Sequence, residues 1–314
     1  MTRTTGTNAA RRDIASDITQ ALLAELDRGV MPWRKPWDAA RVSGGDVTLP
    51  RRVTGEPYRG INVVLLWSAA AAHGYASPTW LTFRQAHACG GQVRSGEKGQ
   101  IVVYYGRAQR TRIDGAGVER DDSFRFLKSF VVFNTAQIAG LPERFHPAPA
   151  VDSAQPILPR DYEAWFARFG VPRIATADLA CYWPGRDAIG MPAPAAFDTI
   201  EHYQATELHE IGHMSGHPAR LNRDMRRYGV HMIAAEELVA EIFSAIAGTY
   251  FQLSPTHLHD HASYIASWIR LLKDDKRAFF AAAAKAQAAV DWMLTVNPPP
   301  GVETRTTEAC HVAA

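Results

Sequence analysis

The segment ATELHEIGHMS, residues 205–215, contains two histidines and a glutamate in an H-E-x-x-H arrangement. It has no proline and begins with strong helix formers, so it predicts a helix, on which residues four apart share one face. His209 and His213 can therefore bind the same metal ion. Glu210 lies beside them, where it can take a proton from a water molecule that the ion activates. The pattern predicts a metal-dependent hydrolytic site.

A catalytic zinc ion usually has three protein ligands and one open position, so a third ligand is needed. His217 follows the second histidine by four residues, but Gly216 interrupts the helix before it, and the H-x-x-G-x-x-H spacing of metzincins is missing. A better candidate lies in residues 234–251, AAEELVAEIFSAIAGTYF, which show a helical apolar stripe. There Glu237 and Glu241 share a face beside apolar residues, where carboxylates are costly unless paired or metal-bound.

This second segment resembles the E-x-x-x-D/E helix of gluzincins. The resemblance implies that Glu237 is the third ligand and that Glu241 accepts a hydrogen bond from the outer ring nitrogen of a ligand histidine. Glu236 points about 100° away from Glu237 on a helix, so we exclude it as a ligand. The alternative is a solvated acidic face. The ligand set predicts Zn²⁺, although Mn²⁺ or Co²⁺ can use the same ligands.

Two further parts of a hydrolytic site have candidates in the sequence. Tyr203, Tyr228 and His231 could stabilise an oxyanion, and the sequence does not choose among them. Residues 180–192, ACYWPGRDAIGMP, predict two short strands around a Pro-Gly turn. They precede the metal helix, as expected of an edge strand that holds an extended substrate, although an ordinary hairpin has the same pattern.

Length and composition indicate a soluble globular protein of about two domains. The chain has 314 residues, of which 46% are hydrophobic and 21% charged. No apolar run reaches the roughly 20 residues needed to cross a bilayer, and the polar N-terminus has no secretory h-region. The three cysteines, Cys89, Cys181 and Cys310, are far apart and form no C-x-x-C pair. We therefore expect a cytoplasmic protein without a membrane partner.

The pattern of helices and strands predicts an α+β fold with two unequal halves. The first half shows helices at residues 12–28, 60–73 and 82–89, and strands at 101–107 and 126–133 joined by a long charged connection. We expect a mixed α/β domain over residues 1–143, a proline-rich linker over 144–160, a mostly helical domain with a small sheet over 161–297, and a flexible tail over 298–314.

The first half of the chain is basic and rich in aromatic residues. Residues 1–150 carry 20 Lys and Arg against 13 Asp and Glu, whereas residues 151–314 carry 14 against 19. Interleaved rings and cations are typical of surfaces that bind single-stranded nucleic acid, although many of these rings could belong to the core. The candidate contacts are Trp33, Arg34, Lys35, Tyr58, Arg59, Asn62, Trp80, Arg84, Arg94, Lys98, Tyr105 and Lys128.

Several long motifs resemble ArdC-type antirestriction proteins, and together they extend over residues 12–295. The motifs are PYRGIN (57–62), WLTFRQA (80–86), GQVRSGEKG (91–99), VFNTAQIAGLP (132–142), LHEIGH (208–213) and AEELVAE (235–241). The resemblance implies a plasmid-encoded protein with a single-stranded DNA-binding N-terminal domain and a zincin-like metallopeptidase domain. It further implies that the protein protects incoming conjugative DNA from host restriction. The same N-terminal domain also occurs in plasmid primases.

The resemblance leaves three functions open. The first is a DNA-binding antirestriction protein in which the metal domain is secondary. The second is a metalloprotease that DNA brings to a protein substrate, such as a host restriction component. The third is a pure binding module with a relic metal fold, against which the intact Glu210 and ligand set argue.

Overall fold

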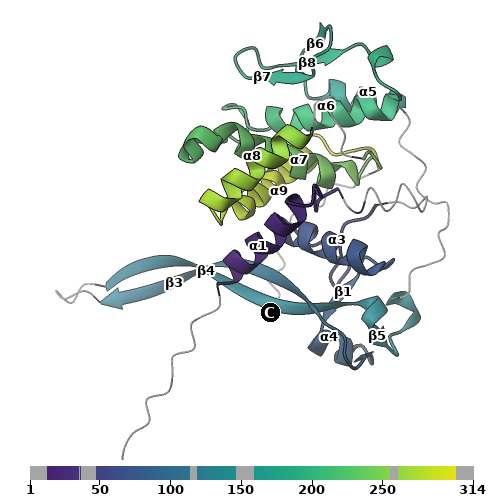
Figure 1. Cartoon of the computed structure of the whole chain (residues 1–314), viewed down its shortest axis with the longest axis vertical. Helices are drawn as coiled ribbons and strands as arrows, with labels where there is room; N and C mark the ends of the chain where they lie inside the picture. Colours follow the sequence, from purple (N-terminus) through teal and green to yellow (C-terminus); the bar gives the residue numbers. More distant parts are fainter. Residues whose placement is uncertain are drawn as a thin grey trace, which may run out of the picture.

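The computed structural model describes residues 13–34, 36, 47–113, 119–145, 159–254 and 261–301. Within them the fold is α+β, as predicted: a layer of helices separates a long β-ribbon from a small three-stranded sheet (Figure 1). No helix of these residues is long and apolar enough to span a membrane.

The described part of the N-terminal half combines three α-helices with an antiparallel sheet in the order β1-β4-β3. Its elements are α1 (Ile14–Leu26), α3 (Ile61–His73), β1 (Trp80–Thr82), α4 (Phe83–Ala88), β2 (Gln92–Val93), β3 (Gln100–Ile113), β4 (Glu119–Asn134) and β5 (Ile138–Ala139). The Thr82 hydroxyl caps α4 in a capping box with Gln85. The helices predicted for this half are therefore present.

The two long strands β3 and β4 correct one prediction from the sequence. They pair from Gln100 opposite Val132 to Ile113 opposite Glu119. Residues 108–113 and 119–125, which we expected to be a charged connection, are thus strand. These residues do not alternate between apolar and polar side chains, so the sequence lacked the signal that reveals a half-buried strand.

The C-terminal half places a helical bundle beneath the small sheet β6-β8-β7. Its elements are α5 (Pro159–Ala167), β6 (Arg173–Thr176), β7 (Cys181–Trp183), β8 (Ala188–Pro192), α6 (Ile200–Met214), η4 (Arg226–His231), α7 (Met232–Gly248), α8 (His261–Asp274) and α9 (Ala278–Val296). Strands β7 and β8 form the hairpin expected for residues 180–192. All five residues of β8 are buried, and β7 lies at the edge of the sheet.

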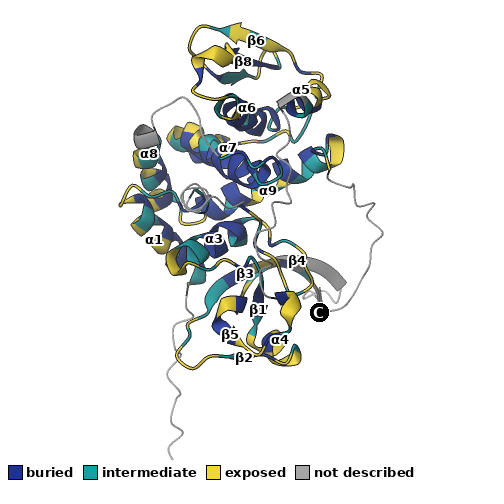
Figure 2. Cartoon of the chain, turned by 90° about the vertical axis from the view of Figure 1, so that its right-hand side faces the viewer, coloured by how far each residue is buried: buried dark blue, intermediate teal, exposed yellow. Residues whose placement is uncertain are grey.

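The two halves share one apolar core. It contains Leu22 and Trp33 from the N-terminal half and Trp268 and Phe279 from the C-terminal half, and Figure 2 shows the buried positions running through the central helices. Hydrogen bonds also join the halves. The Thr19 hydroxyl donates to the carbonyl oxygen of Lys276 at 2.6 Å, the Val47 amide donates to Gln252 at 3.0 Å, and the Gly60 amide donates to Gln287 at 2.9 Å.

Candidate metal centre

Helix α6 carries His209, Glu210 and His213, and its sequence explains both its start and its burial. The Thr199 hydroxyl accepts a hydrogen bond from the His202 amide and caps the first turn. Eleven of its residues are buried, His209 and Glu210 among them. In a helix with so few exposed positions, polar side chains must face a pocket or other polar groups.

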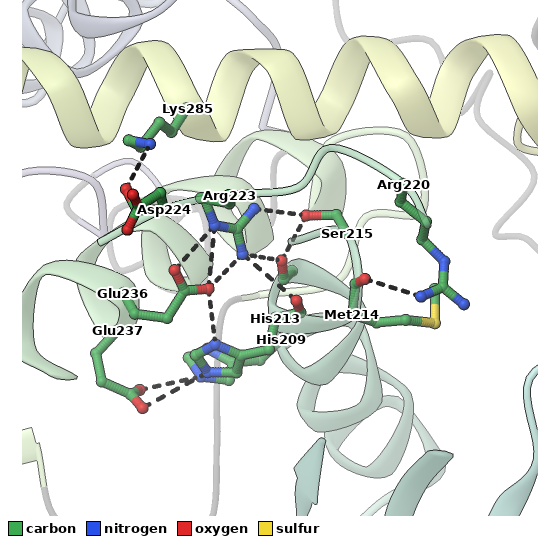
Figure 3. Close-up of polar contacts among 11 residues, drawn as sticks. His209, His213, Met214, Ser215, Arg220, Arg223, Asp224, Glu236, Glu237 and Lys285 are labelled. Atoms are coloured by element: carbon green, nitrogen blue, oxygen red, sulfur yellow. Dashed lines mark hydrogen bonds and ion pairs between the residues drawn. The ribbon is translucent and has the colours of Figure 1, made fainter. Parts of the chain in front are cut away.

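Close packing against α7 brings the second half of the site into reach. A Cβ atom added to Gly212 would lie 3.0 Å from the Ala240 Cα atom and 3.0 Å from the Phe243 Cδ1 atom. Only glycine lets the two helix backbones approach this closely. The approach places Glu236 and Glu237, one turn inside α7, opposite the histidines of α6 (Figure 3).

The substitution Gly212→Ala tests this packing by whether it raises or lowers the stability of the protein. Alanine in place of glycine inside a helix ordinarily stabilises by up to about 1 kcal/mol. Here overpacking against α7 should outweigh that gain and destabilise by about 1–3 kcal/mol. We expect a lower melting temperature and weaker metal binding. The matched control is Gly185→Ala in the open β7–β8 turn, where an added Cβ meets nothing within 4 Å. A Gly212→Ala protein as stable as this control would contradict the packing argument.

His209, His213 and Glu237 form the one group of potential metal ligands among the described residues, with ligand atoms within 4.8 Å of one another. The two histidine Nε2 atoms are 3.2 Å apart. The Glu237 carboxylate oxygens lie 3.4 Å from His209 Nε2 and 3.6 Å from His213 Nε2. Ligands of a tetrahedral ion with bonds of about 2.0–2.1 Å are about 3.4 Å apart, so the three side chains fit a divalent metal ion.

The electrostatics of the cluster favour an ionised Glu237 carboxylate beside the two histidines. Burial would raise the pKa of Glu237, but the positive charges of His213 and His209 outweigh burial and hold that pKa well below its usual range. Burial would lower the pKa of His213, but Glu237 and Glu236 raise it well above its usual value. The carboxylate is therefore ionised, as a metal ligand must be.

Glu236, which we excluded as a ligand, contacts the far side of the same cluster. Its Oε1 atom is 3.3 Å from the outer ring nitrogen, Nδ1, of His213, and it forms an ion pair with Arg223 (Figure 3). Burial would raise the pKa of Glu236, but hydrogen bonds from His213 and Arg223 lower it to about 2. Arg223 also donates to the Ser215 hydroxyl at 2.8 Å and to the Gly212 carbonyl at 2.8 Å.

This arrangement places a carboxylate behind a ligand histidine, where it fixes the orientation of the ring. The sequence assigned that position to Glu241. In the structure, Glu241 accepts a hydrogen bond of 2.9 Å from the Trp33 indole, and its contact with a ligand histidine stays a prediction. The role of Glu236 depends on its ion pair with Arg223. Arg223 lies in the segment between α6 and α7, so no helical spacing in the sequence connects it to Glu236.

The cluster lies in a pocket of about 720 Å³. Glu210 lines this pocket beside the two histidines, and its side chain is buried. Edge strand β7 contributes Cys181 and Tyr182 to the pocket wall, the position expected of a strand that holds an extended substrate. His217 also lines the pocket, and its Nδ1 atom accepts a hydrogen bond from the Ala219 amide.

None of the three candidates for an oxyanion stabiliser lines this pocket. Tyr203 is buried beneath the small sheet beside Arg173, Tyr228 is buried beside Arg227, and His231 lies 2.7 Å from Asp274. They were chosen for closeness in sequence, which does not measure distance in the fold.

The pocket instead contains Tyr264 from α8, which the sequence did not single out. Burial, together with the nearby negative charges of Glu237, Glu210 and Glu241, raises the pKa of Tyr264 to about 12. Its hydroxyl therefore keeps its proton at neutral pH, as a hydrogen-bond donor to a developing oxyanion must.

The predicted nucleic-acid contacts separate into buried and exposed groups. Trp33, Tyr58 and Trp80 are core residues, with 0%, 8% and 1% of their surface exposed, so they present no ring face on which a base could stack. The Asn62 side chain both donates to and accepts from the Val103 backbone at 2.8 Å. These four side chains therefore belong to the packing and hydrogen bonding of the fold, and Trp33 packs against Trp268 and Phe279 of the C-terminal half.

Among the remaining candidates, several rings and cations are exposed, and two of them, Tyr105 and Lys128, lie on the β-ribbon. Arg84, Lys98, Tyr105 and Lys128 are exposed. Arg34 is half-buried, and Lys35 lies outside the described residues. Arg59 pairs with Asp291, and Arg94 pairs with Glu97. Exposed rings that we did not choose are Phe83, Tyr104 and Phe130, each about half exposed.

Comparisons with protein families match both halves of the chain. Residues 12–133 match a model described as the N-terminal domain of anti-restriction factor ArdC, and residues 160–285 match a model of a zincin-like metallopeptidase. An uncharacterized protein, y4eC of Sinorhizobium fredii (strain NBRC 101917 / NGR234), is 37% identical over 90% of this chain and 91% of its own length.

Two DNA primases TraC of Escherichia coli are also similar. They are 35% and 33% identical over 96% and 88% of this chain, which matches 29% and 19% of their respective lengths. The chain thus resembles one part of each primase.

Crystal structures of the antirestriction ArdC protein from the R388 plasmid, 38% identical, have the same fold. The metal-free form superposes with a TM-score of 0.76 and the Mn(II)-bound form with 0.73, each over 91% of this chain and 98% of theirs.

Proposed function

The chain belongs to the family of ArdC-type antirestriction proteins, and from this premise we propose that it protects incoming conjugative DNA from host restriction. In this proposal the N-terminal half binds single-stranded DNA in the cytoplasm, and the C-terminal half holds a divalent metal ion in a peptidase-like site. The observation that supports the metal site best is the convergence of His209, His213 and Glu237 at the spacing of tetrahedral ligands.

His209, His213 and Glu237 would hold the ion, which would supply Lewis acidity to a scissile carbonyl when bound. Mn²⁺ is a candidate beside Zn²⁺, because a relative has been solved in a Mn(II)-bound form. The chain's own residues would do the rest. Glu210 would accept the proton of an attacking water and later return it to the leaving amine. Tyr264 would donate a hydrogen bond to the oxyanion, and β7 would align the peptide.

A second candidate function is a metalloprotease that single-stranded DNA brings to a specific protein substrate. The specific observation in its favour is that Glu210 and the ligand set share one pocket whose wall includes β7, an edge strand of the described sheet. A protein that only binds DNA needs neither feature. The two functions differ in whether the protection of DNA requires Glu210.

DNA binding is expected to depend strongly on salt. The logarithm of the affinity for a single strand should fall linearly with the logarithm of the salt concentration, with a slope of about −0.7 per phosphate contacted. If Lys128 on the ribbon contacts a phosphate, Lys128→Gln should make the slope shallower by about 0.7. Fluorescence anisotropy of a labelled oligonucleotide over a salt series measures both.

The matched control for this measurement is Arg186→Gln, which removes an exposed cation from the C-terminal half. It should leave both the slope and the affinity unchanged. An affinity that does not respond to salt, or an equal effect of the two variants, would contradict the assignment of DNA binding to the N-terminal half.

A further inference from the structure

Trp33 belongs to the N-terminal half, but its side chain packs against the C-terminal half. It follows α1 in the N-terminal half, yet its side chain is fully buried against the C-terminal helices. Its indole nitrogen donates a hydrogen bond of 2.9 Å to Glu241, 208 residues away. Its ring meets the edge of Trp268 with centroids 5.3 Å apart and lies 5.8 Å from the ring of Phe279.

Glu241 connects Trp33 to helix α7, which also carries Glu237. It lies one helical turn after Glu237 on α7, and only 1% of its surface is exposed. A carboxylate buried to this extent needs hydrogen-bond donors, and the Trp33 indole supplies one of them. The hydrogen bond thereby links Trp33 to the turn of α7 next to Glu237.

Trp268 provides a second connection, because it contacts both α7 and Tyr264. Its indole donates a hydrogen bond of 3.0 Å to the Ala234 carbonyl, three residues before Glu237 on α7. Its ring stacks on Tyr264, with centroids 5.9 Å apart and planes at 23°. Since Trp33 packs against the edge of this ring, it supports Tyr264 and the start of α7 as well as Glu241.

We propose that Trp33 is a positioning residue of the metal centre, through which the N-terminal half holds Glu237 and Tyr264 in place. The inference rests on the proposed metal site and extends it. The C-terminal half is then not a self-sufficient metallopeptidase module, because one of its supports comes from the half predicted to bind DNA. By linkage, metal binding strengthens the docking of the N-terminal segment to the same extent that docking strengthens metal binding.

The test is the affinity of the full-length protein for Mn²⁺ and for Zn²⁺ after the substitution Trp33→Phe. Phenylalanine keeps a ring against Trp268 but removes the donor to Glu241. Loss of a direct hydrogen-bond partner of a metal ligand commonly lowers metal affinity about 10- to 100-fold. Trp33 acts one residue further out, so we expect a loss at the lower end, about 10-fold. Titration against a competing chelator measures the affinity, and circular dichroism checks that the protein is folded.

Trp165→Phe is the matched control. Trp165 is also fully buried in the shared core, and its indole donates a hydrogen bond of 2.8 Å to the Asn297 carbonyl, but it does not line the pocket. Its replacement should lower the melting temperature as Trp33→Phe does and leave metal affinity unchanged. A metal affinity lost equally in both variants would show a purely structural role for Trp33 and overturn the proposal.

Trp268→Phe provides an independent second variant, which keeps a ring beside Tyr264 and loses the hydrogen bond to Ala234. It should also weaken metal binding about 10-fold. Trp33→Phe and Trp268→Phe proteins that bind metal as tightly as the wild type would overturn the inference and leave the metal site standing. A wild-type protein that takes up neither Mn²⁺ nor Zn²⁺ would instead refute the proposed metal site itself, and the inference with it.

Discussion

Replacement of His213 by alanine is expected to abolish tight binding of a divalent metal ion, with a loss of affinity on the order of 100-fold or more. The substitution removes one of the three converging ligands and also the ring that Glu236 and Arg223 hold in place. A ligand that binds only the folded protein stabilises it by about 2.7 kcal/mol at 100 times its dissociation constant. The rise in melting temperature on adding Mn²⁺ or Zn²⁺ should therefore disappear in the variant.

His217→Ala is the control for this result, because His217 is a histidine of the same pocket outside the ligand group. It should keep both the metal affinity and the thermal shift. Binding of single-stranded DNA at constant salt should be unchanged in both variants, since the exposed cations of the ribbon are untouched. Retained metal affinity in His213→Ala, or an equal loss in His217→Ala, would contradict the ligand assignment.

Replacement of Glu210 by glutamine is expected to leave metal affinity nearly unchanged and to remove hydrolysis. The amide keeps the size of the side chain but cannot accept the proton of an attacking water. General-base catalysis contributes about 10²- to 10⁴-fold, so any peptidase rate should fall by that factor. The rate can be followed on a denatured protein substrate with a fluorescent label, with metal content measured on the same sample.

The same variant separates the two candidate functions when protection of transferred DNA is measured in a restricting host. Protection that persists in Glu210→Gln would exclude proteolysis as the route. Protection that disappears while DNA binding remains would favour the DNA-tethered metalloprotease. Glu201→Gln is the matched control, since Glu201 is exposed in the first turn of the same helix and should affect neither property.

The sequence predicted well those features that depend on neighbours along one helix. The four-residue spacing of His209 and His213 places both on one face of α6, and Glu237 occupies an equivalent face on α7. The structure brings His209 and His213 together, as their spacing predicted, and places beside them Glu237, which the resemblance to gluzincins implied. The hairpin β7–β8 likewise has a local signal in its Pro-Gly turn.

Features that depend on long-range packing could not be predicted. The pattern of Trp33, Arg34 and Lys35 suits a base-stacking surface, but Trp33 is in the core because α8 and α9 cover it. Tyr264 reaches the pocket from a helix that begins after the residues 255–260, which lie outside the described part of the chain. In both cases the partners are far away in the sequence, so no periodicity connects them.

The shared core changes how the two halves should be regarded. The family models divide the chain between residues 133 and 160, and the prolines there suggested a linker between separate units. The division into two domains stays a prediction. Residues of α1, together with Trp33, belong to the same apolar core as residues of α7 and α9. Truncation at the linker would expose this core, so full-length protein is the right material for every experiment above.

The central claim is that His209, His213 and Glu237 together hold a divalent metal ion. The most direct measurement is anomalous diffraction from crystals of the full-length protein grown with Mn²⁺, recorded on the high-energy side of the manganese absorption edge. The account predicts one strong anomalous peak between the two histidine Nε2 atoms and the Glu237 carboxylate. A pocket without a peak, or a peak held by other side chains while these three point away from it, would contradict the account.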